Sequence, residues 1–244
     1  MTKAAFSRHA AAFWRDPWRG LDRSLGGGVA ALLRVLLGLA LGWWLYVPLH
    51  ELLHAAGCVA AGGSVTKLEI DAMYGGAILS RVFPFVVAGG DYAGRLAGFD
   101  TRGSDLIYLA TDLAPYLLTL WPGFWALRGA AARGRAFGFG FWLPWALAPV
   151  ISLSGDAYEI GSLAVRHLPV WSREPVASQL VGDDVVRKAG DLLALGGEAP
   201  WVGFVVAFSV GAVWAWGWIA GASWLAERLG RAPLGGGLQG PERV

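Results

Sequence analysis

Charged residues, cysteine and histidine are all scarce in this chain of 244 residues. Only 16% of the residues are charged. About a quarter is usual for a soluble domain, so the chain has too little polar surface to be one. The single cysteine excludes an internal disulfide bond and a zinc finger built from several cysteines. The net charge is only +2, from 20 basic and 18 acidic residues, so we expect no nucleic-acid partner.

Apolar residues, tryptophan and glycine are abundant instead. The hydrophobic fraction is 55%, and the chain contains 14 tryptophans and 36 glycines. Tryptophan is typical of membrane interfaces and glycine of close helix contacts in membranes. Four apolar runs exceed the roughly 20 helical residues that cross a bilayer, and they cover residues 28–61, 105–127, 137–165 and 201–226. The sequence therefore predicts an all-α, multi-pass membrane protein with about four transmembrane helices in contact with membrane lipid.

The segments outside these runs complete the predicted organisation. Residues 62–104 are rich in glycine, and residues 65–70 alternate as a strand does, so we expect a small β-sheet or re-entrant element after the first span. Residues 1–27 mix arginine with aromatic residues and lack the apolar stretch of a secretory signal, which is typical of an amphipathic interfacial segment. The other expected segments are an interfacial loop and helix, a fourth transmembrane helix and a disordered tail, at residues 166–200, 201–227 and 228–244.

The distribution of basic residues predicts the orientation of the chain. The N-terminus, the loop at residues 128–136 and the C-terminal tail together hold 11 basic residues. The other two connections together hold eight, spread over longer stretches. Because lysine and arginine are enriched in cytoplasmic loops, we expect both termini in the cytoplasm.

The most specific pattern in the chain is His50-Glu51-Leu52-Leu53-His54, late in the first apolar run. Residues four apart lie on one face of a helix, so both imidazoles can reach one metal ion. Glu51 is turned by about 100° but stays beside that ion, where it can take a proton from a metal-bound water. Ionisable groups are costly inside a membrane unless they are partnered, and a bound cation removes that cost. The pattern therefore predicts a zinc site.

Zinc in a catalytic site has a third protein ligand and keeps its fourth position for water. The candidates are carboxylates in later spans, namely Asp112, Asp156 and Glu159. His50 lies late in the first span, Asp112 early in the second and Asp156 late in the third, so alternating spans bring all three toward the same membrane face. Asp112 can instead hold a histidine ring through a hydrogen bond, and Glu159 follows Asp156 by one helical turn. The residues alone leave the third ligand open.

Residues 28–165 resemble the site-2 protease family of intramembrane zinc metalloproteases. The resemblance rests on the HELLH sequence in a membrane helix, on the glycine-rich strand segment, and on a later span with Pro149 upstream of Asp156. In that family the third zinc ligand is an aspartate of such a span, so the resemblance implies that His50, His54 and Asp156 bind Zn²⁺. The sequence departs from the family pattern because Gly-Asp-Ala replaces Leu-Asp-Gly around Asp156 and the family's asparagine is absent.

The resemblance implies a zinc metalloendopeptidase that hydrolyses peptide bonds of membrane-anchored proteins, with Glu51 activating a zinc-bound water. A helical substrate must unwind first, and the strand with Val65, Leu68 and Ile70 is expected to pair with the unwound segment. The alternative is a catalytically inactive, metal-stabilised membrane scaffold or assembly partner. Glu51 favours the enzyme, because a structural zinc ion needs no base, whereas the altered aspartate motif favours the scaffold. Four histidines are too few for a di-iron membrane oxygenase.

Overall fold

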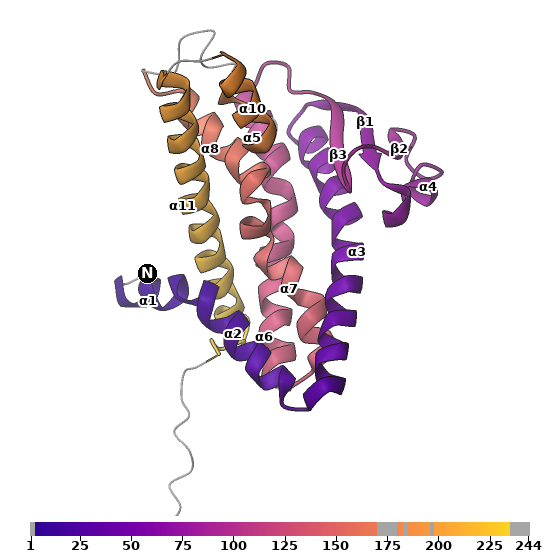
Figure 1. Ribbon diagram of the computed structural model, residues 1–244, viewed down its shortest axis with the longest axis vertical. Coiled ribbons are helices and arrows are strands. Elements are labelled where there is room, and N and C mark those ends of the chain that lie inside the picture. The colour runs from indigo at the N-terminus through magenta and orange to yellow at the C-terminus, as the bar shows by residue number, and fades with distance from the viewer. Residues whose placement is uncertain (1–2, 170–179, 183–184, 196–197, 235–244) are drawn as a thin grey trace, which may run out of the picture. The chain divides into compact units, whose positions relative to one another are not determined.

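The computed structural model describes residues 3–169, 180–182, 185–195 and 198–234 of the chain. These residues are mostly helical, with one small three-stranded sheet (Figure 1). The helical class and the small sheet after the first long helix agree with the sequence-based expectations. Most of the expected disordered tail, residues 235–244, lies outside the described residues.

Three helical segments of the described residues are long and apolar enough to cross a membrane. Each contains an apolar stretch of at least 18 residues with no more than two charged side chains. They correspond to the first and fourth apolar runs of the sequence and to the first part of the third, which breaks at Gly155 before a separate helix, α8 (Asp156–Arg166). These segments are α3 (Gly28–Ala60), α7 (Ala136–Ile151) with its continuation to Ser154, and the part of α11 (Glu198–Arg228) that begins at Trp201.

The second apolar run does not form one long helix. It divides into α5 (Asp105–Leu113), a 3₁₀ turn at Ala114–Tyr116, a π turn at Thr119–Gly123 and α6 (Phe124–Ala132). Pro115 and Pro122 lie in the two turns, and proline has no N–H to continue the helical hydrogen bonds. Trp121 has an extended backbone, with φ −156° and ψ 131°. The expected crossing at residues 105–127 is therefore not a single helix of membrane length.

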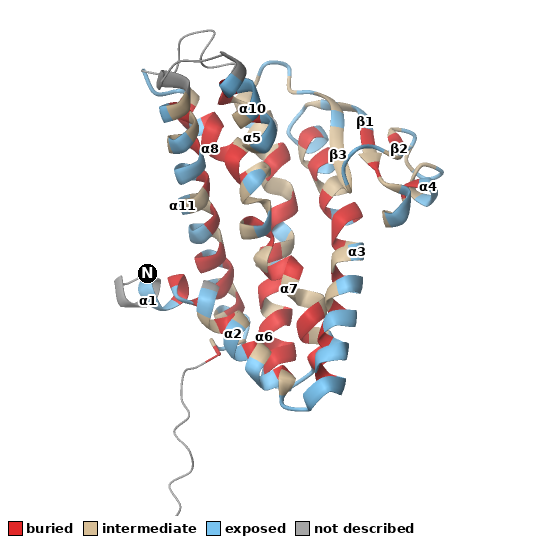
Figure 2. Cartoon of the chain, viewed as in Figure 1, coloured by how far each residue is buried: buried red, intermediate tan, exposed pale blue. Residues whose placement is uncertain are grey.

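The chain forms two compact units. The first unit contains residues 1–44, 118–148 and 216–244, and the second contains residues 45–117 and 149–215. The long helices α3, α7 and α11 each contribute residues to both. Figure 2 shows buried and exposed residues along α11, as expected for a helix that packs on the protein on one side only.

The first unit is organised around a buried arginine. The amino-terminal segment forms two helices, α1 (Lys3–Ala10) and α2 (Ala12–Leu25), and α2 packs against α6. Arg128 of α6 is only 1% exposed and donates to the Asp16 carboxylate of α2 at 2.6 Å and to the Ser223 carbonyl of α11 at 2.7 Å. A buried charge is costly unless it is paired and hydrogen-bonded, and Arg128 meets both conditions. This side chain links three helices of the unit.

The second unit contains the sheet, whose strands have the order β2-β1-β3. The strands are β1 (Ser64–Ile70), β2 (Val86–Ala88) and β3 (Gly94–Asp100). Strand β1 runs parallel to β2 and antiparallel to β3. Leu68, Ile70 and Val86 are buried in one cluster with Ala55, near the end of α3, so the sheet packs on that helix (Figure 1). Between β1 and β2 lie a 3₁₀ turn (Ala72–Tyr74) and the short helix α4 (Gly76–Leu79).

The position of β1 in the sheet bears on the role that the sequence predicts for its residues. Leu68 and Ile70 lie between β2 and β3 and are fully buried, and the Leu68 amide donates to the Phe85 carbonyl at 2.8 Å. Val65 is also paired, with Phe99 of β3. The protein's own strands β2 and β3 thus already make most of the backbone hydrogen bonds to β1 that a substrate was expected to make. Strands β2 and β3 lie at the two edges of the sheet, so each has one side without a strand partner among the described residues.

Helices α5, α8 (Asp156–Arg166), α10 (Val185–Leu195) and the first part of α11 complete the second unit. Asp105 of α5 forms ion pairs with Arg166 of α8 at 3.1 Å and with His167 at 2.8 Å. Gly161 of α8 and Gly211 of α11 each lie where a Cβ would overlap the backbone of the other helix. Such small residues allow close helix packing in membrane proteins. Helix α10 lies within the predicted interfacial segment.

Candidate metal centre

Helix α3 places His50 and His54 side by side. One helical turn separates them, and their Nε2 atoms are 3.0 Å apart with the rings edge to face. Both side chains are more than nine-tenths buried. The spacing predicted from the sequence therefore brings two imidazole nitrogens to one point.

Asp156 meets the two histidines from the first turn of α8. Its Oδ2 atom lies 3.1 Å from His50 Nε2 and 3.4 Å from His54 Nε2. A carboxylate in the first turn of a helix is stabilised by the helix dipole, which favours a helix start at this residue. The structure thus brings together the three residues that the resemblance implies as metal ligands, from elements more than 100 residues apart in sequence.

The other ring nitrogens have partners that fix the rings. His54 Nδ1 lies 2.9 Å from the Thr111 carbonyl oxygen, which can only accept, so Nδ1 carries a hydrogen and the neutral ring has its lone pair on Nε2. His50 Nδ1 is 2.6 Å from the Tyr46 hydroxyl. Metal-binding histidines are usually oriented in this way, through a hydrogen bond from the ring nitrogen that does not bind the metal.

A glycine makes the contact between His54 and Thr111 possible. A Cβ atom at Gly57 of α3 would lie 2.6 Å from the Ala110 carbonyl oxygen of α5. The close approach of the two helices at this glycine brings the next carbonyl, that of Thr111, within reach of the histidine one turn earlier. Gly57 therefore helps to position the His54 ring, because it lets α5 approach α3 closely.

The donor atoms fit a divalent metal ion. Two ring nitrogens and one carboxylate oxygen converge, and all their ligand atoms lie within 4.8 Å of one another. Without a cation or a proton between them, the His54 Nε2 lone pair would face the Asp156 oxygen and repel it. Two histidines and one carboxylate are a known ligand set of catalytic zinc, with a fourth position left for water. The donor set of the cluster therefore fits a divalent metal ion.

Tyr116 and Ser152 hold the aspartate. The Tyr116 hydroxyl donates to Asp156 Oδ2 at 3.1 Å and also forms a hydrogen bond with the Ser152 hydroxyl. Tyr116 is completely buried. Sequence reasoning missed these residues together with Tyr46 and Thr111. Tyr46 alone had a visible signal, because it precedes His50 by four residues and so shares its helix face.

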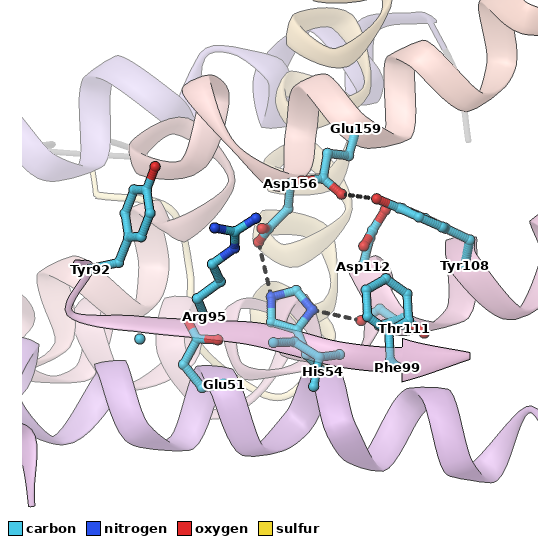
Figure 3. Close-up of a pocket in the computed structure, with 12 residues that line it drawn as sticks. Glu51, His54, Tyr92, Arg95, Phe99, Tyr108, Thr111, Asp112, Asp156 and Glu159 are labelled. Atoms are coloured by element: carbon cyan, nitrogen blue, oxygen red, sulfur yellow. Dashed lines mark hydrogen bonds and ion pairs between the residues drawn. The ribbon is translucent and has the colours of Figure 1, made fainter. Parts of the chain in front are cut away.

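Glu51 lies in a cavity beside the three ligands. The cavity has a volume of about 270 Å³ and is lined by side chains from α3, β3, α5 and α8 (Figure 3). A Cβ atom at Gly94 of β3 would overlap the Glu51 side chain, so the strand backbone lies directly against this carboxylate. The lining residues are Glu51, His54, Tyr92, Gly94, Arg95, Leu96, Phe99, Tyr108, Thr111, Asp112, Asp156 and Glu159.

Asp112 and Glu159 line the cavity but are not part of the converging group. Asp112 is 4% exposed, and its Oδ2 atom has no hydrogen-bond partner within the described residues. Glu159 accepts a hydrogen bond of 2.5 Å from the Tyr108 hydroxyl. From the sequence, Asp112 was considered as the residue that holds a histidine ring through a hydrogen bond. In the structure the backbone carbonyl of the neighbouring Thr111 accepts that hydrogen bond from His54.

Comparison of the chain with protein-family models, with curated proteins and with solved structures found no match. The resemblance to site-2 proteases therefore stays a hypothesis, carried by the HELLH sequence and the later aspartate. The evidence on function is therefore the geometry of the cavity and of the three converging side chains, His50, His54 and Asp156.

Proposed function

We propose that the chain is an intramembrane zinc metalloprotease of the site-2 protease type. The observation that carries the proposal is the convergence of His50 Nε2, His54 Nε2 and Asp156 Oδ2 beside the cavity that contains Glu51. Zinc held by these three atoms would supply a Lewis acid that polarises a peptide carbonyl and makes water more acidic. A purely structural site has no need of the glutamate.

Glu51 is the proposed general base and acid. Its carboxylate takes a proton from the attacking water, whose oxygen forms a bond to the carbonyl carbon of the substrate. The same carboxylate then gives that proton to the leaving nitrogen as the C–N bond breaks. The contact with Gly94 supports this role, because it restricts the Glu51 side chain to the side of the cavity.

The proposed substrate is a membrane-anchored protein whose cleaved segment is extended. A transmembrane helix has its carbonyls hydrogen-bonded, so it must unwind before water attacks one of them. Strand β3 contributes four residues to the cavity wall and has a free edge. We propose that the unwound segment pairs with β3 instead of with β1.

The proposed membrane topology has four crossings and cytoplasmic termini. Helices α3, α7 and α11 supply three membrane-length segments, and the fourth crossing is the interrupted segment at residues 105–132. Broken helices are tolerated at membrane depth where they are buried in protein or line a cavity. Tyr108, Thr111 and Asp112 of the interrupted segment line the cavity, which supports such a crossing.

Metal analysis and cleavage together test this proposal. We expect about one zinc ion per chain in detergent-purified protein, lost in His54→Ala and Asp156→Ala but kept in Asp112→Ala. Glu51→Gln should keep zinc and lose cleavage of a membrane-anchored substrate. Retention of zinc in wild type without any cleavage would favour the metal-stabilised scaffold. Absence of zinc from gently purified wild type would contradict both functions.

A further inference from the structure

Helix α2 of the first unit presents two tryptophan rings away from the protein. Its inward face consists of the small or polar residues Ala12, Asp16 and Ser24, which are all at most 3% exposed. Trp14 and Trp18 lie on the opposite face, 64% and 62% exposed. An amphipathic helix on a soluble protein buries its large apolar side chains, so the outward face of α2 is adapted to a medium less polar than water.

Exposed arginines accompany these tryptophans. Arg15, Arg19 and Arg23 follow one another at intervals of four residues, so they form one stripe along α2. Arg19 and Arg23 are exposed, whereas Arg15 donates to Asp16 at 3.1 Å. Arg19 also donates one hydrogen bond of 3.0 Å to the Leu234 carbonyl, which leaves further N–H groups of its five for other acceptors.

The first unit as a whole carries a positive net charge, like the arginine stripe of α2. Its three sequence segments hold 12 basic and 4 acidic residues, a net charge of +8, whereas those of the second unit hold 8 and 14, a net charge of −6. Two of the four acidic residues of the first unit form ion pairs within that unit. Asp16 pairs with Arg128, and Glu227 pairs with Arg8 and contacts His9. The other exposed arginines among the described residues of the unit are Arg8, Arg34, Arg133, Arg135 and Arg228.

We propose that α2 is a binding surface for anionic phospholipids. Tryptophan rings prefer the boundary between headgroups and acyl chains, and arginine forms forked hydrogen bonds with phosphate. Trp14 and Trp18 enter that boundary while Arg19 and Arg23 bind the phosphates of the same leaflet. Three membrane-length helices in the same chain favour a lipid surface over nucleic acid as the source of the phosphate. The inference rests on the membrane insertion of the proposed function and is independent of its protease activity.

Native mass spectrometry of the full chain in detergent tests this inference. Purified protein is titrated with phosphatidylglycerol and, separately, with the zwitterionic phosphatidylcholine of the same acyl chains. We expect tighter binding of phosphatidylglycerol, and about fivefold weaker binding for each arginine lost in Arg19→Gln/Arg23→Gln. Trp14→Ala/Trp18→Ala should weaken the binding of both lipids alike. Equal affinities of the two lipids for wild type would overturn the inference.

Two controls separate lipid selection from loss of the fold. Arg81→Gln/Arg102→Gln removes two exposed arginines from the second unit and should leave the preference for phosphatidylglycerol unchanged. Arg19→Lys/Arg23→Lys keeps the charge but loses the forked hydrogen bonds, so its preference for phosphatidylglycerol should lie between those of wild type and of the glutamine variant. An unchanged preference in a folded Arg19→Gln/Arg23→Gln protein also contradicts the inference. Zinc content and cleavage should not change in any of these variants.

Discussion

The candidate metal centre depends on a few polar atoms outside the ligand set. Thr111 fixes the protonated nitrogen of His54, Tyr46 contacts His50, and Tyr116 donates to Asp156. Each contact decides which atom of a ligand faces the common point. Since these partners are not ligands themselves, their removal should alter metal affinity without abolishing the site.

The Tyr46→Phe variant tests this view of the site. It leaves His50 Nδ1 without its hydroxyl partner, so we expect zinc affinity to fall by about 10- to 100-fold with the fold retained. Competition with a metal chelator measures the affinity. The matched control is Tyr158→Phe, which removes a hydroxyl bonded to the Leu180 carbonyl in the same unit. An unchanged affinity in Tyr46→Phe would show that the hydroxyl does not orient the ring.

The Gly94→Ala variant tests the position of Glu51. The added methyl group would overlap the Glu51 side chain, so the carboxylate must move from its place in the cavity. A displacement of about 1 Å at a catalytic group can cost roughly 100-fold in rate, and we expect a loss of that order in cleavage. Zinc content should stay the same, because the three atoms nearest to the added methyl group all belong to Glu51 and none to a ligand of the converging group.

The control for Gly94→Ala is Ala97→Ser, which changes an exposed residue of the same strand. It should leave both cleavage and zinc unchanged. Loss of zinc in Gly94→Ala would mean that the strand supports the whole centre, and full activity would mean that Glu51 tolerates the displacement.

The sequence predicted the side chains that form the site better than it predicted the groups that hydrogen-bond to them. His50, Glu51 and His54 follow from a local helical spacing, and the resemblance implied Asp156. The Thr111 carbonyl was not predictable, because every residue has a carbonyl and only the approach of α5 to Gly57 selects this one. The partners of a site are set by packing, which a local pattern does not contain.

At the scale of elements, hydropathy identified the long helices but not the break in the second apolar run. The signal for the break was present in Pro115 and Pro122, which mean hydropathy does not register. The alternation of residues 65–70 predicted a strand correctly. Its central place in the sheet was not predictable, because strand order depends on pairing with residues 86–88 and 94–100, which are distant in sequence.

The buried pair of Arg128 and Asp16 gives a prediction about the packing of α2 on α6. Both side chains are almost completely buried, and they are 2.6 Å apart. Arg128→Met leaves the buried Asp16 carboxylate with only Arg15 and the Leu234 amide as partners, so we expect a loss of about 3 kcal/mol in the free energy of unfolding, the low end of the cost of breaking a buried pair. Asp16→Asn combined with Arg128→Met should recover part of that loss. Thermal unfolding of the purified protein measures both effects.

The exposed pair of Arg8 and Glu227 provides the comparison for this prediction. Their atoms are 3.1 Å apart, but the side chains are 52% and 32% exposed, so water and salt screen the interaction. Arg8→Gln should therefore change the stability by less than about 1 kcal/mol. A similar effect of Arg8→Gln and Arg128→Met would contradict the proposed dependence on burial.

At the scale of the whole molecule, the charges divide between the two units. The first carries a net charge of +8 and the second −6, although the chain as a whole is close to neutral at +2. Composition alone hides this division. Because basic residues accumulate on the cytoplasmic side of membrane proteins, the proposed topology predicts a cytoplasmic position for the positive unit.

Cysteine labelling tests this orientation. The native Cys58 is buried, and replacing it with alanine gives a background without thiols. On that background, Ser7→Cys marks the exposed amino-terminal segment and Arg102→Cys marks the exposed turn after β3. Helix α3 connects the two segments and is 33 residues long, which exceeds the roughly 20 residues needed to cross once.

In intact bacterial cells, a membrane-impermeant maleimide should label the Arg102→Cys variant but not the Ser7→Cys variant. Lysed cells should give labelling of both, because the reagent then reaches both faces of the membrane. Equal labelling of the two variants in intact cells would contradict a crossing by α3. Labelling of Ser7→Cys alone would reverse the orientation that the arginines predict, and with it the face on which the positive unit lies.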